Sequence, residues 1–242
     1  MRLTFRRVTR AEWTKLSALR STWIVLGLMV VLTVGLAGAA GQHAKAARLG
    51  DAFLGVDVFS LLLGVFGILM ITGEYGSGLI RATFAAVPRR VPVLAAKAVV
   101  LALVSIPVMA VACLGALGAD RVFAGVPFTD PGVARAAAGA AAAPIGLALL
   151  GLGLGALIRH TAAAITVYVL SMLVLPALLR AALPDRIGGH VVQYVPVAAA
   201  QGMYAVHNPF QMLSPGPAAL VLLAWVAAAL AAGGLVLWRR DP

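Results

Sequence analysis

The residues best able to do chemistry gather in the segment Gly73–Arg90, which lies between two long apolar runs. It carries one carboxylate, Glu74, and the guanidinium groups of Arg81, Arg89 and Arg90. Such groups recognise a partner protein through hydrogen bonds and ion pairs, and a guanidinium matches a carboxylate in shape. Held at a membrane surface between two spans, this segment predicts a docking site for a soluble protein.

The rest of the chain has no arrangement typical of an enzyme. It lacks the Gly-x-x-x-x-Gly-Lys-Ser/Thr loop that binds ATP and the His-Glu-x-x-His pattern of a zinc protease. The histidines are expected outside the hydrocarbon core, with His160 on the opposite side from His43, His190 and His207. Cys113 is the single cysteine, which excludes a cysteine-based metal cluster. We expect no catalytic residue, no metal site and no cofactor in this chain.

Asp57 lies about one turn inside the outer end of the second predicted span. An ionised carboxylate in a span is costly unless it is hydrated or paired, so Asp57 is a candidate membrane site. Arg135, at the outer start of the fourth span, is its candidate partner. The alternative is that Asp57 lies at the wet boundary of the membrane without a special role.

The composition indicates what must hold these residues in place. Of 242 residues, 62% are hydrophobic and 11% are charged, and the mean hydropathy is +1.00. Soluble domains carry about 25% charged residues, and about 20 apolar residues suffice for a helix to cross a bilayer. The sequence therefore predicts an all-α membrane protein with a single transmembrane domain over residues 1–242. Six spans are predicted, at about 23–41, 53–72, 98–118, 136–158, 161–179 and 218–237.

The fourth and fifth predicted spans are separated only by Arg159-His160. One uninterrupted helix there would be too long for a bilayer, and an arginine at its centre would cost about 3 kcal/mol. The sequence therefore predicts a helical hairpin.

Lysine and arginine are concentrated in the leader, in the connection between the second and third spans, and at the C-terminal end. Because positive charge favours the inner side of a membrane, a multi-pass protein with both termini cytoplasmic is predicted. The net charge of +11 follows from this distribution at the ends of apolar runs, and no nucleic-acid partner is expected.

The leader, residues 1–22, has the pattern of a basic amphipathic helix lying in the inner headgroup layer, in contact with membrane lipids. Glu12 interrupts the apolar stripe of this helix. It either pairs with Lys15 three residues on or pairs with a basic residue of the segment Glu74–Arg90, which would tie the leader to the docking segment. The apolar stripe consists of Val8, Leu19, Phe5, Leu16 and Trp13.

A short helix is predicted within the docking segment. Gly76 and Gly78 permit a sharp change of direction after Thr72, and Ser77 is the expected N-cap. Pro88 would end the helix. The residues spaced to share one face are Ile80, Phe84 and Val87.

Two motifs resemble permeases of the type-2 ABC exporter class. One is Glu74-Tyr75-x-x-Gly78-x-Ile80-Arg81-x-Thr83, followed by Pro88-Arg89-Arg90 and Leu94-x-x-Lys97. The other is Ala11-Glu12-Trp13-Thr14-Lys15-Leu16 with Leu19-Arg20-Ser21-Thr22-Trp23, which looks like the start of such permeases in high-GC Gram-positive bacteria. The resemblance covers the whole chain in span count and topology.

In that family, the connection after the second span holds a cytoplasmic coupling helix that receives motion from a separate ATP-binding subunit. The resemblance places Glu74, Tyr75, Gly78, Arg81, Thr83, Pro88, Arg89 and Arg90 in the coupling segment, and Glu12, Trp13 and Lys15 in the leader contact. It also implies ATP and Mg²⁺ in the partner subunit, a dimer with a second permease copy or homologue, and the bacterial cytoplasmic membrane. This chain departs from many relatives in having Pro196-Val197-Ala198-Ala199-Ala200 where they have a Pro-Ser-Asn-Ala-Gly-like turn.

The sequence also predicts structural features of two further regions. The stretch Arg180–Gly216 is too apolar for a free loop and too broken for a seventh span, so an external re-entrant or surface-lying cap is predicted. The fourth span is rich in glycine, including Gly151-x-x-x-Gly155, a pattern that favours close approach of another helix.

Three functions fit these patterns to different degrees. The first is the permease subunit of an ATP-driven exporter that moves a hydrophobic or amphipathic substrate by alternating access. The second is a secondary transporter or channel, which would carry ionisable residues near the bilayer midplane, where only Asp57 comes near. The third is a membrane-embedded enzyme, which the missing catalytic pattern argues against.

Overall fold

The computed structural model describes residues 4–43, 53–87, 90–124, 132–206 and 212–239. Within these ranges the regular elements are all helices. They are α1 (Phe5–Ala18), α2 (Arg20–His43), α3 (Leu54–Gly76), α4 (Leu79–Ala86), α5 (Val91–Ala124), α6 (Val133–Ile158), α7 (Thr161–Val169), the π-helix η2 (Leu170–Val174), α8 (Leu175–Ala182), α9 (Asp185–Val192), α10 (Pro196–Tyr204) and α11 (Pro215–Arg239).

Six helical segments among the described residues are long and apolar enough to cross a membrane, as predicted. The chain is therefore a multi-pass membrane protein. The segments are Arg20–Gln42, Gly55–Gly76, Val91–Phe123, Val133–Ile158, Thr161–Ala182 and Pro215–Arg239. Several extend past the predicted boundaries because the helices continue through polar residues at their ends.

The third span shows the largest difference. Its helix, α5, has 34 residues rather than the predicted stretch 98–118. At 1.5 Å per residue this is about 51 Å, well beyond a hydrocarbon core of about 30 Å. The added residues at its start, 91–97, include Lys97, and those at its end, 119–124, include Asp120 and Arg121.

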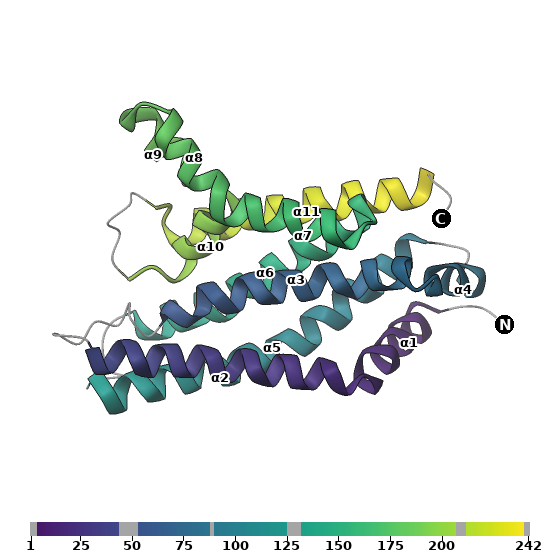
Figure 1. Cartoon of the computed structure of the whole chain (residues 1–242), viewed down its shortest axis with the longest axis horizontal. Coiled ribbons are helices and arrows are strands. Elements are labelled where there is room, and N and C mark those ends of the chain that lie inside the picture. The colour runs from purple at the N-terminus through teal and green to yellow at the C-terminus, as the bar shows by residue number, and fades with distance from the viewer. Residues whose placement is uncertain (1–3, 44–52, 88–89, 125–131, 207–211, 240–242) are drawn as a thin grey trace.

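The predicted break between the fourth and fifth spans is confirmed. Arg159 has a φ of 60°, in the left-handed region that ends an α-helix. His160 then caps α7, because its Nδ1 accepts a hydrogen bond from the backbone N–H of Ala163 at 3.3 Å. This turn connects α6 to α7, and the two helices contact each other (Figure 1).

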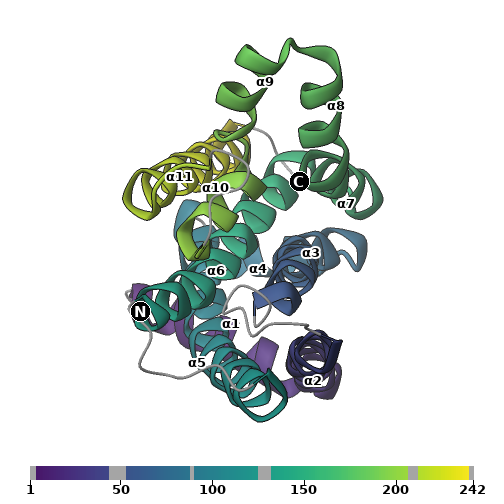
Figure 2. The same ribbon diagram turned by 90° about the vertical axis from the view of Figure 1, so that its left-hand side faces the viewer.

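Helix α6 lies at the centre of the bundle, with α3, α5, α10 and α11 packed around it (Figure 2). Its glycines allow this contact, as the sequence predicts. A side chain at Gly151 would collide with the backbone carbonyl of Gly64 on α3, and one at Gly153 would lie 2.7 Å from the backbone of Ala229 on α11. Small residues on several faces of one helix thus let it pack closely against several neighbours.

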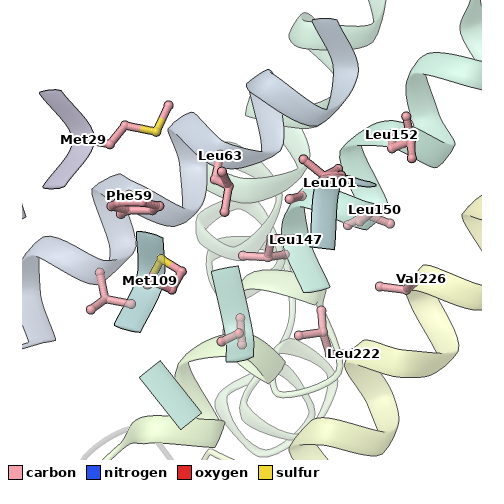
Figure 3. Close-up of a cluster of buried hydrophobic side chains, with 14 of the residues drawn as sticks. Met29, Phe59, Leu63, Leu101, Met109, Leu147, Leu150, Leu152, Leu222 and Val226 are labelled. Carbon is pink, nitrogen blue, oxygen red and sulfur yellow. The ribbon is translucent and has the colours of Figure 1, made fainter. Parts of the chain in front are cut away.

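Buried side chains from α2, α3, α5, α6 and α11 form one hydrophobic core (Figure 3). Phe59, Leu63 and Leu147 are among its most deeply buried members. Helices α1 and α4 lie at the end of the bundle where α11 finishes, and α10 lies toward the opposite end (Figure 1).

The segment predicted as a cap contains the end of α8, the helices α9 and α10, and short non-helical connections between them. Helix α10 packs against α6 and α11, whereas α8 and α9 project away from the bundle (Figure 1). Helix α10 begins at Pro196, so the sequence Pro196–Ala200 forms its first turns.

Candidate functional site

The corner between α3 and α4 differs from the prediction in two respects. Helix α3 does not end at Thr72 but continues to Gly76, so Glu74 and Tyr75 are helical residues. Ser77 is not the N-cap of α4, because its hydroxyl donates to the carbonyl of Gly73 at 2.8 Å and so completes α3. Gly78 makes the turn between the two helices, with a φ of 74° that glycine adopts without strain.

Helix α4 has the predicted apolar face, and this face packs against protein. Ile80 is buried, and Phe84 and Val87 pack against a small cluster of Val8, Val93 and Ala96 from α1 and α5. The opposite face is exposed. It consists of Leu79, Arg81, Ala82, Ala85 and Ala86.

A cluster of four charged side chains, hereafter the charge cluster, joins α1, α3 and α5; Glu12, Glu74 and Lys97 are buried and Lys15 is partly exposed. Glu12 accepts from Lys15 at 2.7 Å through Oε1 and from Lys97 at 2.6 Å through Oε2. Glu74 accepts through Oε1 from Lys97 at 2.7 Å and from Lys15 at 3.0 Å. The two carboxylates and two ammonium groups balance, which is the arrangement in which buried charges are tolerated.

The hydrogen bonds of both lysines are complete. Lys97, only 1% exposed, makes its third bond to the carbonyl of Met70 at 3.2 Å. Lys15 makes its third bond to the hydroxyl of Thr83 on α4 at 3.1 Å. Since an ammonium group has three hydrogens, neither lysine has a donor left for a ligand.

The position of Glu12 explains why it interrupts the apolar stripe of the leader. Val8, Glu12 and Leu16 are the buried residues of α1, so Glu12 faces the protein and not water. The predicted pair with Lys15 is present. The second carboxylate oxygen binds Lys97 of α5 instead of Arg81 or Arg90, and the leader contacts the docking segment through Lys15.

The pKa of Lys15 reflects two opposing effects. Burial alone would lower it, but the hydrogen bonds and negative charges of Glu12 and Glu74 outweigh burial and raise the pKa above its ordinary value of 10.5. The side chain therefore stays charged at physiological pH.

Other residues of the predicted docking segment face the end of α11. Arg90 donates to the carbonyl of Leu237 at 3.1 Å, and its guanidinium lies 5.5 Å from the Phe84 ring. Arg159 donates to the carbonyl of Val236 at 2.7 Å and lies 5.5 Å from the Tyr75 ring. Cations at the C-terminus of a helix are stabilised by its free carbonyls, so these contacts fix the end of α11.

The remaining predicted residues divide as follows. Arg81 is exposed, and Trp13 is 42% exposed and takes no part in the charge cluster. Pro88 and Arg89 lie outside the described residues. Lys97 was missed as a site residue, although an ionisable side chain next to an apolar run is a signal that could have found it.

At the other end of α3, Asp57 lies in the first turn of the helix. The predicted partner Arg135 is not bound to it, because its guanidinium donates to the carbonyl of Ala205 at 3.0 Å. Asp57 Oδ1 instead accepts from the Tyr204 hydroxyl at 2.6 Å and the Gln201 amide at 3.1 Å. These donors come from α10, which the sequence marks only as part of a cap.

The Asp57 carboxylate borders a cavity of about 310 Å³ between α3, α6, α7, η2, α8, α9 and α10. Burial and the neighbouring Asp57 charge raise the pKa of Tyr204 well above 10.0, so this hydroxyl keeps its hydrogen and remains a donor.

In comparisons with known proteins, no family model matches this chain, and no curated protein matches it. Within the described residues, no group of three or more histidine, cysteine, aspartate or glutamate side chains is placed to hold a metal ion. The polar side chains that bear on function lie near the two ends of α3, around Glu74 and Asp57.

Proposed function

We propose that this chain is the membrane-spanning permease subunit of an ATP-driven exporter. One observation carries the proposal: α4 has one exposed face containing Arg81, and its other face and its neighbours are fixed to three helices. A soluble partner that binds this exposed surface can move it, and because the surface is fixed to other helices, the movement is transmitted to the membrane-spanning helices.

The charge cluster is the attachment. Lys15 of α1 binds Thr83 of α4, and through Glu12 and Glu74 the same network reaches Lys97 of α5. Because these bonds link four helices and their charges balance, a displacement of α4 would move α1, α3 and α5 together. This is the role of the coupling helix in the exporters that the two sequence motifs resemble.

The proposal places ATP and Mg²⁺ in a separate ABC ATP-binding subunit that contacts α4 from the cytoplasm. Both termini would then be cytoplasmic, with α1 lying in the inner headgroup layer among membrane lipids and α10 belonging to an external re-entrant cap. A second permease copy or homologue would complete the dimer in a bacterial cytoplasmic membrane. The exported substrate would be hydrophobic or amphipathic.

The test is association with an ABC ATP-binding subunit, which the proposal expects to be encoded next to this chain. Arg81→Glu reverses the one charge on the exposed face of α4, so we expect at least tenfold weaker co-purification and loss of ATPase stimulation in lipid nanodiscs. Arg239→Glu is the matched control, since it makes the same charge change on an exposed residue at the same end of the bundle. Equal association of the Arg81→Glu variant and the unchanged chain would refute the docking assignment.

A secondary transporter or channel is the second candidate, because Asp57 lies within a span beside a cavity. Such a protein would move its substrate in vesicles that contain this chain alone, driven by an ion gradient. Transport that instead requires the ATP-binding subunit and ATP would favour the exporter.

A further inference from the structure

The cavity beside Asp57 has the composition of a ligand site. Asp57 and Ser60 line it from α3, Gln201 lines it from α10, and Leu147 and Met172 supply apolar surface. Its volume of about 310 Å³ lies at the small end of the range for ligand pockets, about 300–1,000 Å³. An apolar cavity with a few converging polar groups is the usual form of a small-molecule site.

The helix around the cavity is locally irregular. Leu170–Val174 form the π-helix η2, and Met172 and Leu173 of this turn line the cavity. A π-turn widens the helix and leaves its backbone bonding irregular, and such turns occur frequently at functional sites. Here it lines the same cavity as Asp57.

Two polar groups in this cavity lack partners. Both neutral donors of α10 bind Oδ1 of Asp57, and among the described residues no donor reaches Oδ2 and no cation pairs with the carboxylate. Ser60 is only 4% exposed, yet its hydroxyl has no hydrogen-bond partner. The two residues are three apart on α3, so they share one face of the helix.

The unmatched charge in the cavity is negative. Arg180 also lines the cavity, but it has a partner of its own. A ligand that supplies several N–H donors and one positive charge would satisfy both Asp57 Oδ2 and the Ser60 hydroxyl. The Ser60 hydroxyl is buried and unsatisfied, which is costly. A hydrogen bond to the Asp57 carboxylate is stronger when the donor is charged, so such a ligand is favoured over an uncharged one.

We propose that this cavity binds a protonated amine carried on a compact apolar body. The ammonium group lies between Asp57 and Ser60, and the apolar body packs against Leu61, Leu147 and Met172. The site belongs to this chain alone and does not depend on the proposed ATP-binding partner. If the chain is an exporter subunit, the same site names lipophilic amines as its substrate class.

The test uses the full chain purified into phosphatidylcholine nanodiscs at pH 7. Equilibrium binding of radiolabelled 2-phenylethylammonium is measured, with 2-phenylethanol as an uncharged competitor of similar size. We expect saturable binding of the amine at one site per chain, and no displacement by the alcohol at a tenfold higher concentration.

Two variants locate the site. Asp57→Asn keeps a hydrogen-bond acceptor for Tyr204 and Gln201 but removes the charge, so amine affinity should fall at least about tenfold, as expected for loss of a charge-assisted hydrogen bond. Ser60→Ala should weaken binding several-fold. Ser105→Ala is its matched control, because Ser105 is also a buried hydroxyl without a partner but does not line this cavity.

Several outcomes would overturn the proposal. They are equal binding of amine and alcohol, unchanged affinity in Asp57→Asn, and equal losses in Ser60→Ala and Ser105→Ala. Competitive displacement of the amine by millimolar Na⁺, dependent on Asp57, would identify an alkali-ion site instead. Should Asp57→Asn fail to fold, the two competitors and the two serine variants decide the matter. None of these measurements requires ATP, so they can fail or succeed independently of the exporter assignment.

Discussion

Helix α3 carries one carboxylate near each end, and the two are treated differently by the fold. Glu74 belongs to a charge cluster in which two carboxylates balance two ammonium groups and every ammonium hydrogen has an acceptor. Among the described residues, Asp57 receives two neutral donors, both on one oxygen, and it borders a cavity. We call the Glu74 end of α3, where the charges balance, the closed end. We call the Asp57 end, where one carboxylate oxygen has no donor among the described residues, the open end.

This difference suggests that one end of α3 fixes neighbouring helices and the other end binds a ligand. A saturated, neutral network has nothing left to offer a ligand, so its contribution is to fix α1, α3, α4 and α5 relative to one another. A carboxylate with a free oxygen beside unfilled space can still gain a hydrogen bond and a counter-charge. We therefore assign positioning to the Glu74 end and recognition to the Asp57 end.

The largest expected effect on stability comes from removing one cation from the closed end. Lys97→Met leaves two buried carboxylates with Lys15 as their only counter-charge, so we expect a loss of about 3–5 kcal/mol in stability, as for a buried ion pair that loses one partner. Thermal unfolding of the purified variant in nanodiscs measures this loss.

Adding Glu12→Gln to Lys97→Met provides the control. It restores the charge balance between Lys15 and Glu74, so the double variant should recover part of the lost stability and the two effects should not add. A Lys97→Met variant that unfolds at the temperature of the unchanged chain would mean that the cluster does not hold these helices.

A smaller effect is expected at the open end. Tyr204→Phe removes the 2.6 Å hydrogen bond from α10 to Asp57 and leaves only the Gln201 amide. Hydrogen bonds to charged groups contribute about 1.5–3 kcal/mol, so the unfolding midpoint should fall less than in Lys97→Met. A larger loss than in Lys97→Met would reverse the comparison and make Asp57 the main structural anchor.

The sequence predicted the spans well because each depends on a local run of apolar residues. It ended the second span too early and began the third span too late, because hydropathy treats Glu74 and Lys97 as charges that must face water. In the fold each neutralises the other at 2.7 Å, although they are 23 residues apart in the chain. No local window contains that information.

The two candidate sites were predictable to different extents. Gly78 marked the turn before α4 through its own backbone freedom, and Ile80, Phe84 and Val87 marked the buried face through their spacing. The donors to Asp57 were not found, because Gln201 and Tyr204 carry no charge and lie 144 and 147 residues further along the chain. Matching a carboxylate to the nearest predicted arginine gave the wrong partner.

The smallest effect tests how far the closed end is protected from water. Lys15 makes the same kinds of bonds as Lys97, but its side chain is 35% exposed against 2% for Lys97. Water can replace part of the interactions that Lys15→Met removes, so we expect a loss of stability below about 1 kcal/mol, typical of an exposed ion pair.

Because the folded state raises the pKa of Lys15 above 10.5, the contribution of Lys15 to stability is complete at every pH below the unfolded pKa. It is lost only as the pH rises through the folded pKa. The difference in unfolding midpoint between Lys15→Met and the unchanged chain should therefore be the same at pH 6 and at pH 8. A loss as large as that of Lys97→Met would show that the exposure of Lys15 does not weaken its ion pairs. A loss that changes between these two pH values would show that a group other than Lys15 sets the difference.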